Sequence, residues 1–62
     1  MGNSRSTTII ELEARLITET SLARKFEFEA GEVWLPKETH KWDPAEQIVS
    51  LRENLAIEKG LV

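Results

Sequence analysis

Residues 26–35 read FEFEAGEVWL, and this stretch decides the expected fold. Hydrophobic and charged residues alternate on both sides of an Ala-Gly pair, which is typical of two half-buried strands joined by a tight turn. Glycine suits the second turn position because it adopts a positive φ without a steric penalty. With Ala30 and Gly31 as the loop, Glu29 is expected directly opposite Glu32. The stretch therefore predicts an antiparallel hairpin.

The two faces of this hairpin differ in character. One face carries hydrophobic side chains that can form a core: Phe26, Phe28, Val33 and Leu35. The other face carries three carboxylates and one aromatic residue: Glu27, Glu29, Glu32 and Trp34. Trp34 has two possible roles, either as a core residue under another element or as a contact residue, since Trp is enriched at binding hot spots. Pro36 cannot donate to a ladder and is expected to end the strand.

A second alternating stretch precedes the hairpin at residues 8–20. It places Ile10, Leu12, Ala14 and Leu16 on one side and Glu11, Glu13 and Arg15 on the other. The segment ELEARL also consists of good helix formers, but the β-branched residues around it favour a strand. Residues 1–6 are polar and expected to be frayed, and residues 21–25 form a polar connection or the start of the next strand.

The C-terminal part allows two interpretations. Asp43-Pro44 can open a long helix, or it can form a turn before a short strand at residues 48–51 and a final helix. The residues from Ser50 to Glu53 match a capping box, and Gly60 stands where such a helix would end, with Leu61 able to make the closing contact. The residue pattern alone leaves the two interpretations close to even.

Length and composition bound the function. A chain of 62 residues is expected to form a single domain, 1–62, with a small core. Cysteine is absent, which excludes disulfides and thiolate sites, and the single histidine, His40, is expected in an exposed loop. No catalytic, cofactor or metal motif is found, so we expect neither an enzyme nor a bound cofactor. Apolar runs of two or three residues are too short to span a membrane, and a cytoplasmic location is expected.

Two motifs, WLPK at residues 34–37 and LAIEKGL at residues 55–61, resemble those of a group of small phage and prophage proteins. In that group, a strand ending in VWLPK precedes a short acidic hairpin, a second strand and a closing helix. The resemblance covers the chain from about residue 26 onward and departs from the group at Arg52 and Asn54, where relatives usually place Pro and Trp. It implies a turn at residues 43–47, a strand at 48–51 and a helix from about 52 to 59.

With that choice, the expected fold is α+β, a small antiparallel sheet of three to four strands with one short C-terminal helix. The helix is expected to cover one face of the sheet. The expected core consists of Ile10, Leu12, Leu16, Phe26, Phe28, Val33, Leu35, Ile48, Leu51 and Leu55.

The chain also resembles, in size, charge and phage affiliation, the small acidic anti-CRISPR inhibitors of type I surveillance complexes. Its 11 acidic and 8 basic residues give a net charge of -3. Clefts that bind DNA are lined with Lys and Arg, so a protein that gathers carboxylates on one face could occupy such a cleft. The residues expected to bind the partner are Glu11, Glu13, Glu27, Glu29, Glu32 and Trp34.

The expected function is therefore that of a non-enzymatic, phage-encoded inhibitor that binds a host CRISPR complex through a DNA-mimicking face and blocks access of target DNA. Direct binding to nucleic acid or to a membrane is not expected. Two alternatives stay open. The acidic residues could serve only to solvate the open face of the sheet, or the chain could be a phage structural or accessory module that self-associates through its apolar helix or a sheet edge.

Overall fold

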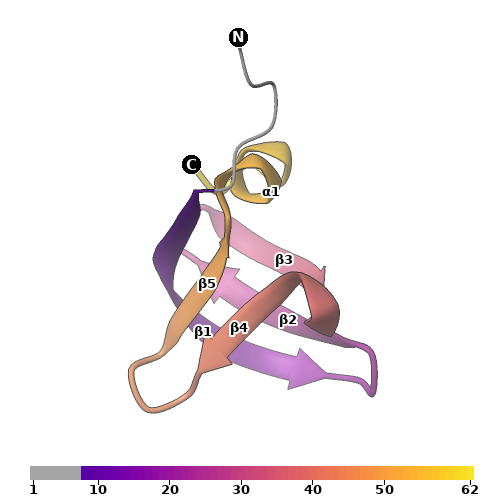
Figure 1. Cartoon of the computed structure of the whole chain (residues 1–62). Helices are drawn as coiled ribbons and strands as arrows, with labels where there is room; N and C mark the ends of the chain where they lie inside the picture. Colours follow the sequence, from indigo (N-terminus) through magenta and orange to yellow (C-terminus); the bar gives the residue numbers. More distant parts are fainter. Residues whose placement is uncertain (1–7) are drawn as a thin grey trace, which may run out of the picture.

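Residues 8–62 are described by the computed structural model, in which five strands form one antiparallel sheet with a short helix at one end (Figure 1). The elements are β1 (Ile9–Glu19), β2 (Ala23–Phe28), β3 (Gly31–Pro36), a 3-10 turn η1 (Lys37–Thr39), β4 (His40–Asp43), β5 (Ile48–Arg52) and α1 (Glu53–Glu58). An antiparallel sheet with a short C-terminal helix is confirmed, but the sheet has five strands rather than three to four. The frayed end expected at residues 1–6 lies outside the described residues.

The strand that was not expected is β4, which lies at the edge of the sheet order β3-β2-β1-β5-β4. Its four residues, HKWD, form a segment too short and too polar to show a clear alternation. The structure nevertheless orients them as a strand does, with His40 buried, Lys41 exposed and Trp42 half-buried. No helix within residues 8–62 is long and apolar enough to cross a membrane.

The hairpin of β2 and β3 forms with a different register from the expected one. Phe28 pairs with Gly31 and Glu27 with Glu32, so the turn residues are Glu29 and Ala30, and the expected pairing of Glu29 with Glu32 is wrong. Gly31 has a φ of 138°, so the chain uses its glycine just after the turn instead of within it. The register differs by two residues, an even number, and each side chain therefore stays on its expected face.

Strand β1 joins the two halves of the sheet, β5 with β4 on one side and β2 with β3 on the other. Its residues 9–13 pair with β5, and its residues 14–19 pair with β2, with a register shift between Leu16 and Thr18. Such an irregularity bends and twists a strand, and β1 curves strongly from one half to the other (Figure 1). The bend brings β4 over β2, so that the ring of Phe26 lies 4.9 Å from that of Trp42. The core lies between the two halves.

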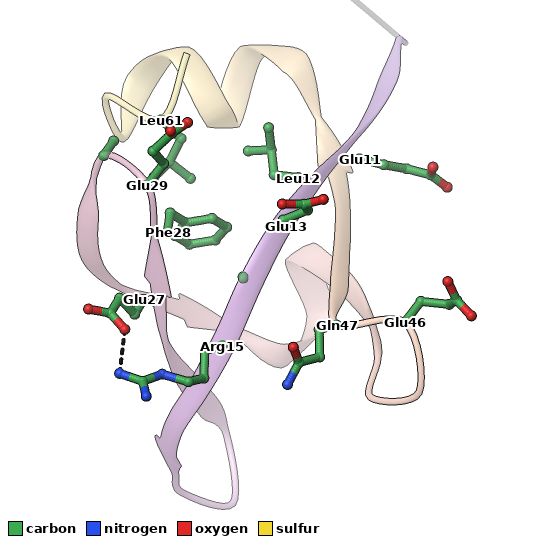
Figure 2. Close-up of a pocket in the computed structure, with 12 residues that line it drawn as sticks. Glu11, Leu12, Glu13, Arg15, Glu27, Phe28, Glu29, Glu46, Gln47 and Leu61 are labelled. Atoms are coloured by element: carbon green, nitrogen blue, oxygen red, sulfur yellow. Dashed lines mark hydrogen bonds and ion pairs between the residues drawn. The ribbon is translucent and has the colours of Figure 1, made fainter.

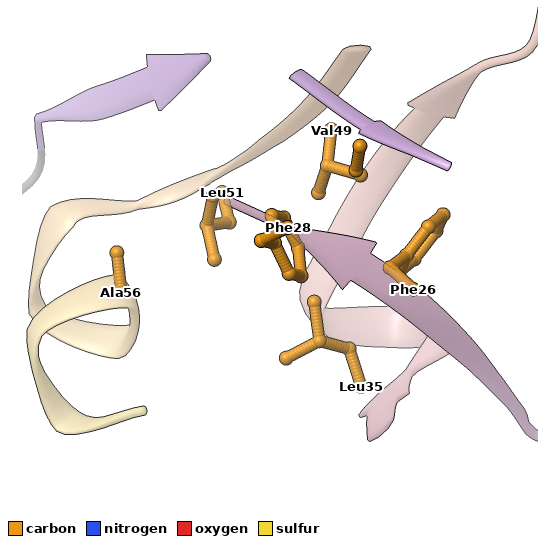
Figure 3. Close-up of a cluster of buried hydrophobic side chains, with 7 residues drawn as sticks. Phe26, Phe28, Leu35, Val49, Leu51 and Ala56 are labelled. Carbon is orange, nitrogen blue, oxygen red and sulfur yellow. The ribbon is translucent and has the colours of Figure 1, made fainter. Parts of the chain in front are cut away.

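The buried core contains residues from both halves and from the helix (Figure 3): Ala14, Phe26, Phe28, Leu35, Val49, Leu51 and Ala56. Most of the other expected core residues are half-buried against this cluster. Ile48 is the exception, because adjacent strand residues face opposite ways, and Val49 points inward with Leu51. The expectation that Ile48 shares the core with Leu51 is therefore wrong.

The end of the chain follows the turn, strand and helix interpretation, and the long helix from Pro44 does not form. Helix α1 begins at Glu53 with Arg52 as its N-cap and no side-chain cap, so the capping box expected at Ser50 is wrong, since Ser50 lies within β5. The helix ends as expected. Gly60 has a φ of 73°, and the N–H groups of Gly60 and Leu61 donate to Ile57 and Ala56.

Two neighbouring residues of β5 provide a test of the core. We expect Val49→Ala to lower the free energy of unfolding by about 2 kcal/mol, because it removes fully buried methyl groups and leaves a cavity. Ile48→Ala removes more atoms but at a half-buried site, and should cost less than about 1 kcal/mol. Urea denaturation of both variants measures the difference. A larger loss for Ile48→Ala would mean that β5 faces the other way.

Candidate functional site

An open groove of about 970 Å³ runs along the middle of β1, between the turn that joins β2 to β3 and the turn that joins β4 to β5 (Figure 2). Five carboxylates and one basic side chain of the described residues line it: Glu11, Glu13, Glu27, Glu29, Glu46 and Arg15. The less exposed side chains of Phe28, Leu12 and Leu61 also line the groove. The groove therefore has an acidic rim over a partly apolar floor.

The groove exists because β1 changes partners at Ala14. Two hydrogen bonds show which residues of β1 bond to β5: the N–H of Glu53 donates to the carbonyl of Thr8, and the N–H of Ala14 donates to the carbonyl of Gln47. Because bonded pairs alternate along an antiparallel ladder, the even-numbered residues of this part of β1 bond toward β5. Antiparallel ladders alternate, and the backbone groups of Glu11 and Glu13 therefore point away from β5. Within the described part of the chain, β2 pairs with β1 only from Ala14 onward, which leaves that side of Glu11 and Glu13 facing the groove.

The carboxylates of the hairpin are partly neutralised. Arg15 donates to Glu27 across the β1–β2 ladder, and Lys25 lies 3.1 Å from Glu32 across the β2–β3 ladder. All four side chains are substantially exposed to solvent, so each pair contributes at most about 1 kcal/mol. These two acids offer less net charge to a partner than the sequence suggests.

The other groove carboxylates are not neutralised in this way. Glu11, Glu13, Glu29 and Glu46 form no ion pair with any residue from 8 to 62. Basic side chains gather instead near the far end of β1, where Glu19 contacts both Arg24, at 3.2 Å, and Lys37, at 3.4 Å. Four acids without an ion pair among the described residues therefore line the groove, although Glu38 and Glu58 are also unpaired and lie outside it.

Four of the six expected partner-binding residues line this groove: Glu11, Glu13, Glu27 and Glu29. Glu32 and Trp34 lie outside it, on the outer face of the edge strand β3, where Trp34 is 45% exposed and pairs with Lys25. Trp34 is not covered by another element of the described chain, so the core role is wrong, and the contact role stays a prediction. Trp34 and the acidic residues of the groove therefore belong to two separate surfaces.

Sequence reasoning missed Glu46 as a groove residue. The carboxylate of Asp43 accepts hydrogen bonds from the backbone N–H groups of Ala45 and Glu46, at 3.0 and 3.2 Å, and this arrangement shapes the turn before β5. Gln47 completes the turn with a φ of 56°. The Asp-Pro signal predicted the turn, but only the bend of β1 brings the turn beside Glu13.

His40 is buried, and the expectation of an exposed loop histidine is wrong. Its Nδ1–H donates to the carbonyl of Pro36 at 2.9 Å, and Arg24 lies 3.3 Å from Nε2, an arrangement that fits the neutral ring. Its ring meets Phe26 edge-on at 5.2 Å. Burial lowers the pKa of His40 below its usual value, and the positive charge of Arg24 lowers it further, against the raising effect of the Pro36 hydrogen bond.

Residues 8–62 contain no group of three side chains placed to hold a metal ion. Comparisons with protein-family models, with curated proteins and with solved structures find no match for the chain.

The burial of His40 predicts how stability depends on pH. The unfolded chain binds a proton at His40 near pH 6.5, whereas the folded chain keeps the ring neutral to lower pH. The free energy of unfolding should therefore fall as the pH drops from about 6.5 through the folded pKa, and this contribution should not vary above that range.

Replacing the titrating ring tests this account. We expect the His40→Gln variant to lose less stability than the wild type between about pH 7 and pH 5.5, because glutamine does not titrate there. Urea denaturation of both proteins at the two pH values provides the measurement. An identical pH dependence in both would contradict the assigned role of His40.

Proposed function

We propose that this protein is a non-enzymatic binding module that presents its acidic groove to a cationic surface of a nucleic-acid-handling protein. The observation that carries the proposal is that Glu11, Glu13, Glu29 and Glu46 all line one groove and have no basic partner in the described chain. A protein surface whose charges serve only solubility usually mixes acidic and basic side chains. Here the rim of the groove carries one sign almost throughout.

The groove is negatively charged, as DNA is, and can therefore attract a cleft that binds DNA. Duplex DNA carries about one negative charge per 1.7 Å of helix axis, and proteins meet this charge with Lys and Arg. Carboxylates held close together on a rigid strand attract the same cationic cleft and exclude DNA from it. Glu11 and Glu13 are suited to this role because β1 fixes both on one side of the strand.

The resemblance to phage proteins and to small acidic anti-CRISPR inhibitors suggests the biological setting. In this proposal, the protein is encoded by a phage, acts in the host cytoplasm and binds a CRISPR surveillance complex so that target DNA cannot enter. The groove, and not the whole outer face of the hairpin, is the proposed contact surface. Glu27 takes part only if a partner's Lys or Arg replaces Arg15, which the low cost of breaking an exposed ion pair allows.

Affinity capture from a host lysate, followed by mass spectrometry, tests the proposal. We expect the wild-type chain to retain a nucleic-acid-handling complex at low salt and to release it steeply as salt increases, because exposed charges are screened. The double variant Glu11→Lys plus Glu13→Lys should weaken that binding by at least about tenfold, since it reverses the charge of the groove.

A matched control makes the outcome specific. Glu38 and Glu58 are exposed and lie outside the groove, so Glu38→Lys plus Glu58→Lys changes the net charge equally and should leave binding nearly unchanged. Equal losses in the two double variants would show that only net charge matters. Capture that yields no nucleic-acid-handling component would remove the proposed function.

A further inference from the structure

The two edge strands of the sheet differ in how well they are protected from pairing with another chain. Exposed edges usually carry a protecting device, such as a short strand, a lysine, a proline or a bulge. Strand β4 has two of these, because it contains only four residues and one of them is Lys41. Strand β3 has six residues, pairs with β2 without any register shift, and has no lysine, with its only proline at the last position.

The free edge of β3 carries backbone groups that can hydrogen-bond. Phe28 and Gly31 close the two-residue turn, and in such a turn the closing pair exchanges hydrogen bonds. Bonded pairs then alternate, so Val33 and Leu35 bond toward β2, while the N–H and C=O groups of Glu32 and Trp34 point away from it. Within the described part of the chain, no strand pairs with that side of β3.

We propose that β3 pairs with β3 of a second copy of this chain, antiparallel and about a two-fold axis at Val33, to give a continuous ten-stranded sheet. In this register, Glu32 of each chain lies opposite Trp34 of the other, and about four backbone hydrogen bonds form between the edges. The residues that pair in the dimer, Glu32, Val33 and Trp34, do not line the acidic groove, so the inference is independent of the proposed function.

Side chains select this register over its neighbours. Centring the axis on Glu32 would place the two Glu32 carboxylates directly opposite each other, which is destabilising. Centring it on Trp34 would place Glu32 opposite Pro36, which has no N–H to donate. Centring it on Val33 avoids both problems and sets Val33 against Val33 on the inner face.

The outer face is complementary to itself in that register. The β2–β3 pairing places Lys25 beside Trp34 and Glu27 beside Glu32. In the dimer, Trp34 of one chain lies opposite Glu32 of the other. The cross-strand pair of Lys25 and Trp34 in one chain therefore lies in line with the pair of Glu32 and Glu27 in the other, which brings basic and acidic side chains toward each other. The two Trp34 residues become diagonal neighbours across the axis, about 7–8 Å apart, a separation that aromatic side chains can span.

The centre of this surface has the character of an interface. Trp34 is 45% exposed in the single chain, although Trp is among the residues that most often supply binding energy when buried between two proteins. The Lys25–Glu32 ion pairs flank the two tryptophans and would form a charged rim. The apolar centre and charged rim together fit a second copy of this chain.

Sedimentation equilibrium of the full chain at increasing concentrations, up to about 1 mM, tests the inference. We expect the wild type to dimerise and Trp34→Glu to remain monomeric, because the variant places a second carboxylate directly opposite Glu32 of the other chain on both sides of the axis. Leu22→Glu is the matched control, since it introduces the same charge at a more exposed hydrophobic residue, which lies beside Pro36 at the end of β3 and outside the paired residues 32–34, and it should leave the dimer intact.

Amide hydrogen exchange on the wild type provides a second readout that does not depend on a variant. The N–H groups of Glu32 and Trp34 should exchange quickly at low concentration and become protected as the dimer forms. A chain that stays monomeric up to the highest concentration would overturn the inference. So would a dimer in which these two amides stay unprotected or which Trp34→Glu leaves intact.

Discussion

The contact of Phe26 with the rings of His40 and Trp42 on β4 is the constraint on which the rest of the structure depends. Phe26 is fully buried on β2, and Trp42 lies 4.9 Å from its ring although β1 and β5 separate the two strands in the sheet. A flat sheet could not bring these strands together, so the sheet must fold over its own hydrophobic face. In a described chain of 55 residues with one short helix, this folding is what creates an interior.

The groove follows from the same folding. The first part of β1 pairs with β5 and the second part pairs with β2. The change of pairing at Ala14 leaves one side of Glu11 and Glu13 without a neighbouring strand. The turns before β3 and before β5 then lie on either side of that gap, and each contributes a carboxylate, Glu29 and Glu46. The fold thus gathers acids that are far apart along the chain, and the proposed binding role depends on this gathering.

Much of the fold could be predicted from the sequence because it depends on local periodicity. The alternation in residues 8–20 indicated β1, and Gly60 with Leu61 indicated the end of α1. The faces of the hairpin were also correct, since an even shift in register preserves them. Local patterns could not predict β4, which has three polar residues and Trp42 and forms a strand only because Phe26 and β5 offer Trp42 a place to pack.

The candidate site was predictable only in part, for a related reason. The alternation of β1 correctly put Glu11 and Glu13 on one side, but the neutralisation of Glu27 depends on the pairing of β1 with β2, which places Arg15 beside it. The burial of His40 likewise depends on the packing of β4 against β2. Periodicity tells which way a side chain points, whereas strand pairing decides which side chains meet.

The change of partner in β1 is the central claim, and amide hydrogen exchange across residues 10–14 tests it most directly. The account predicts an alternating pattern, in which the N–H groups of Ile10, Leu12 and Ala14 are protected by β5 while those of Glu11 and Glu13 exchange quickly. Uniform protection from Ile10 to Ala14 would contradict it, because β1 would then be paired on both sides and the groove would be closed.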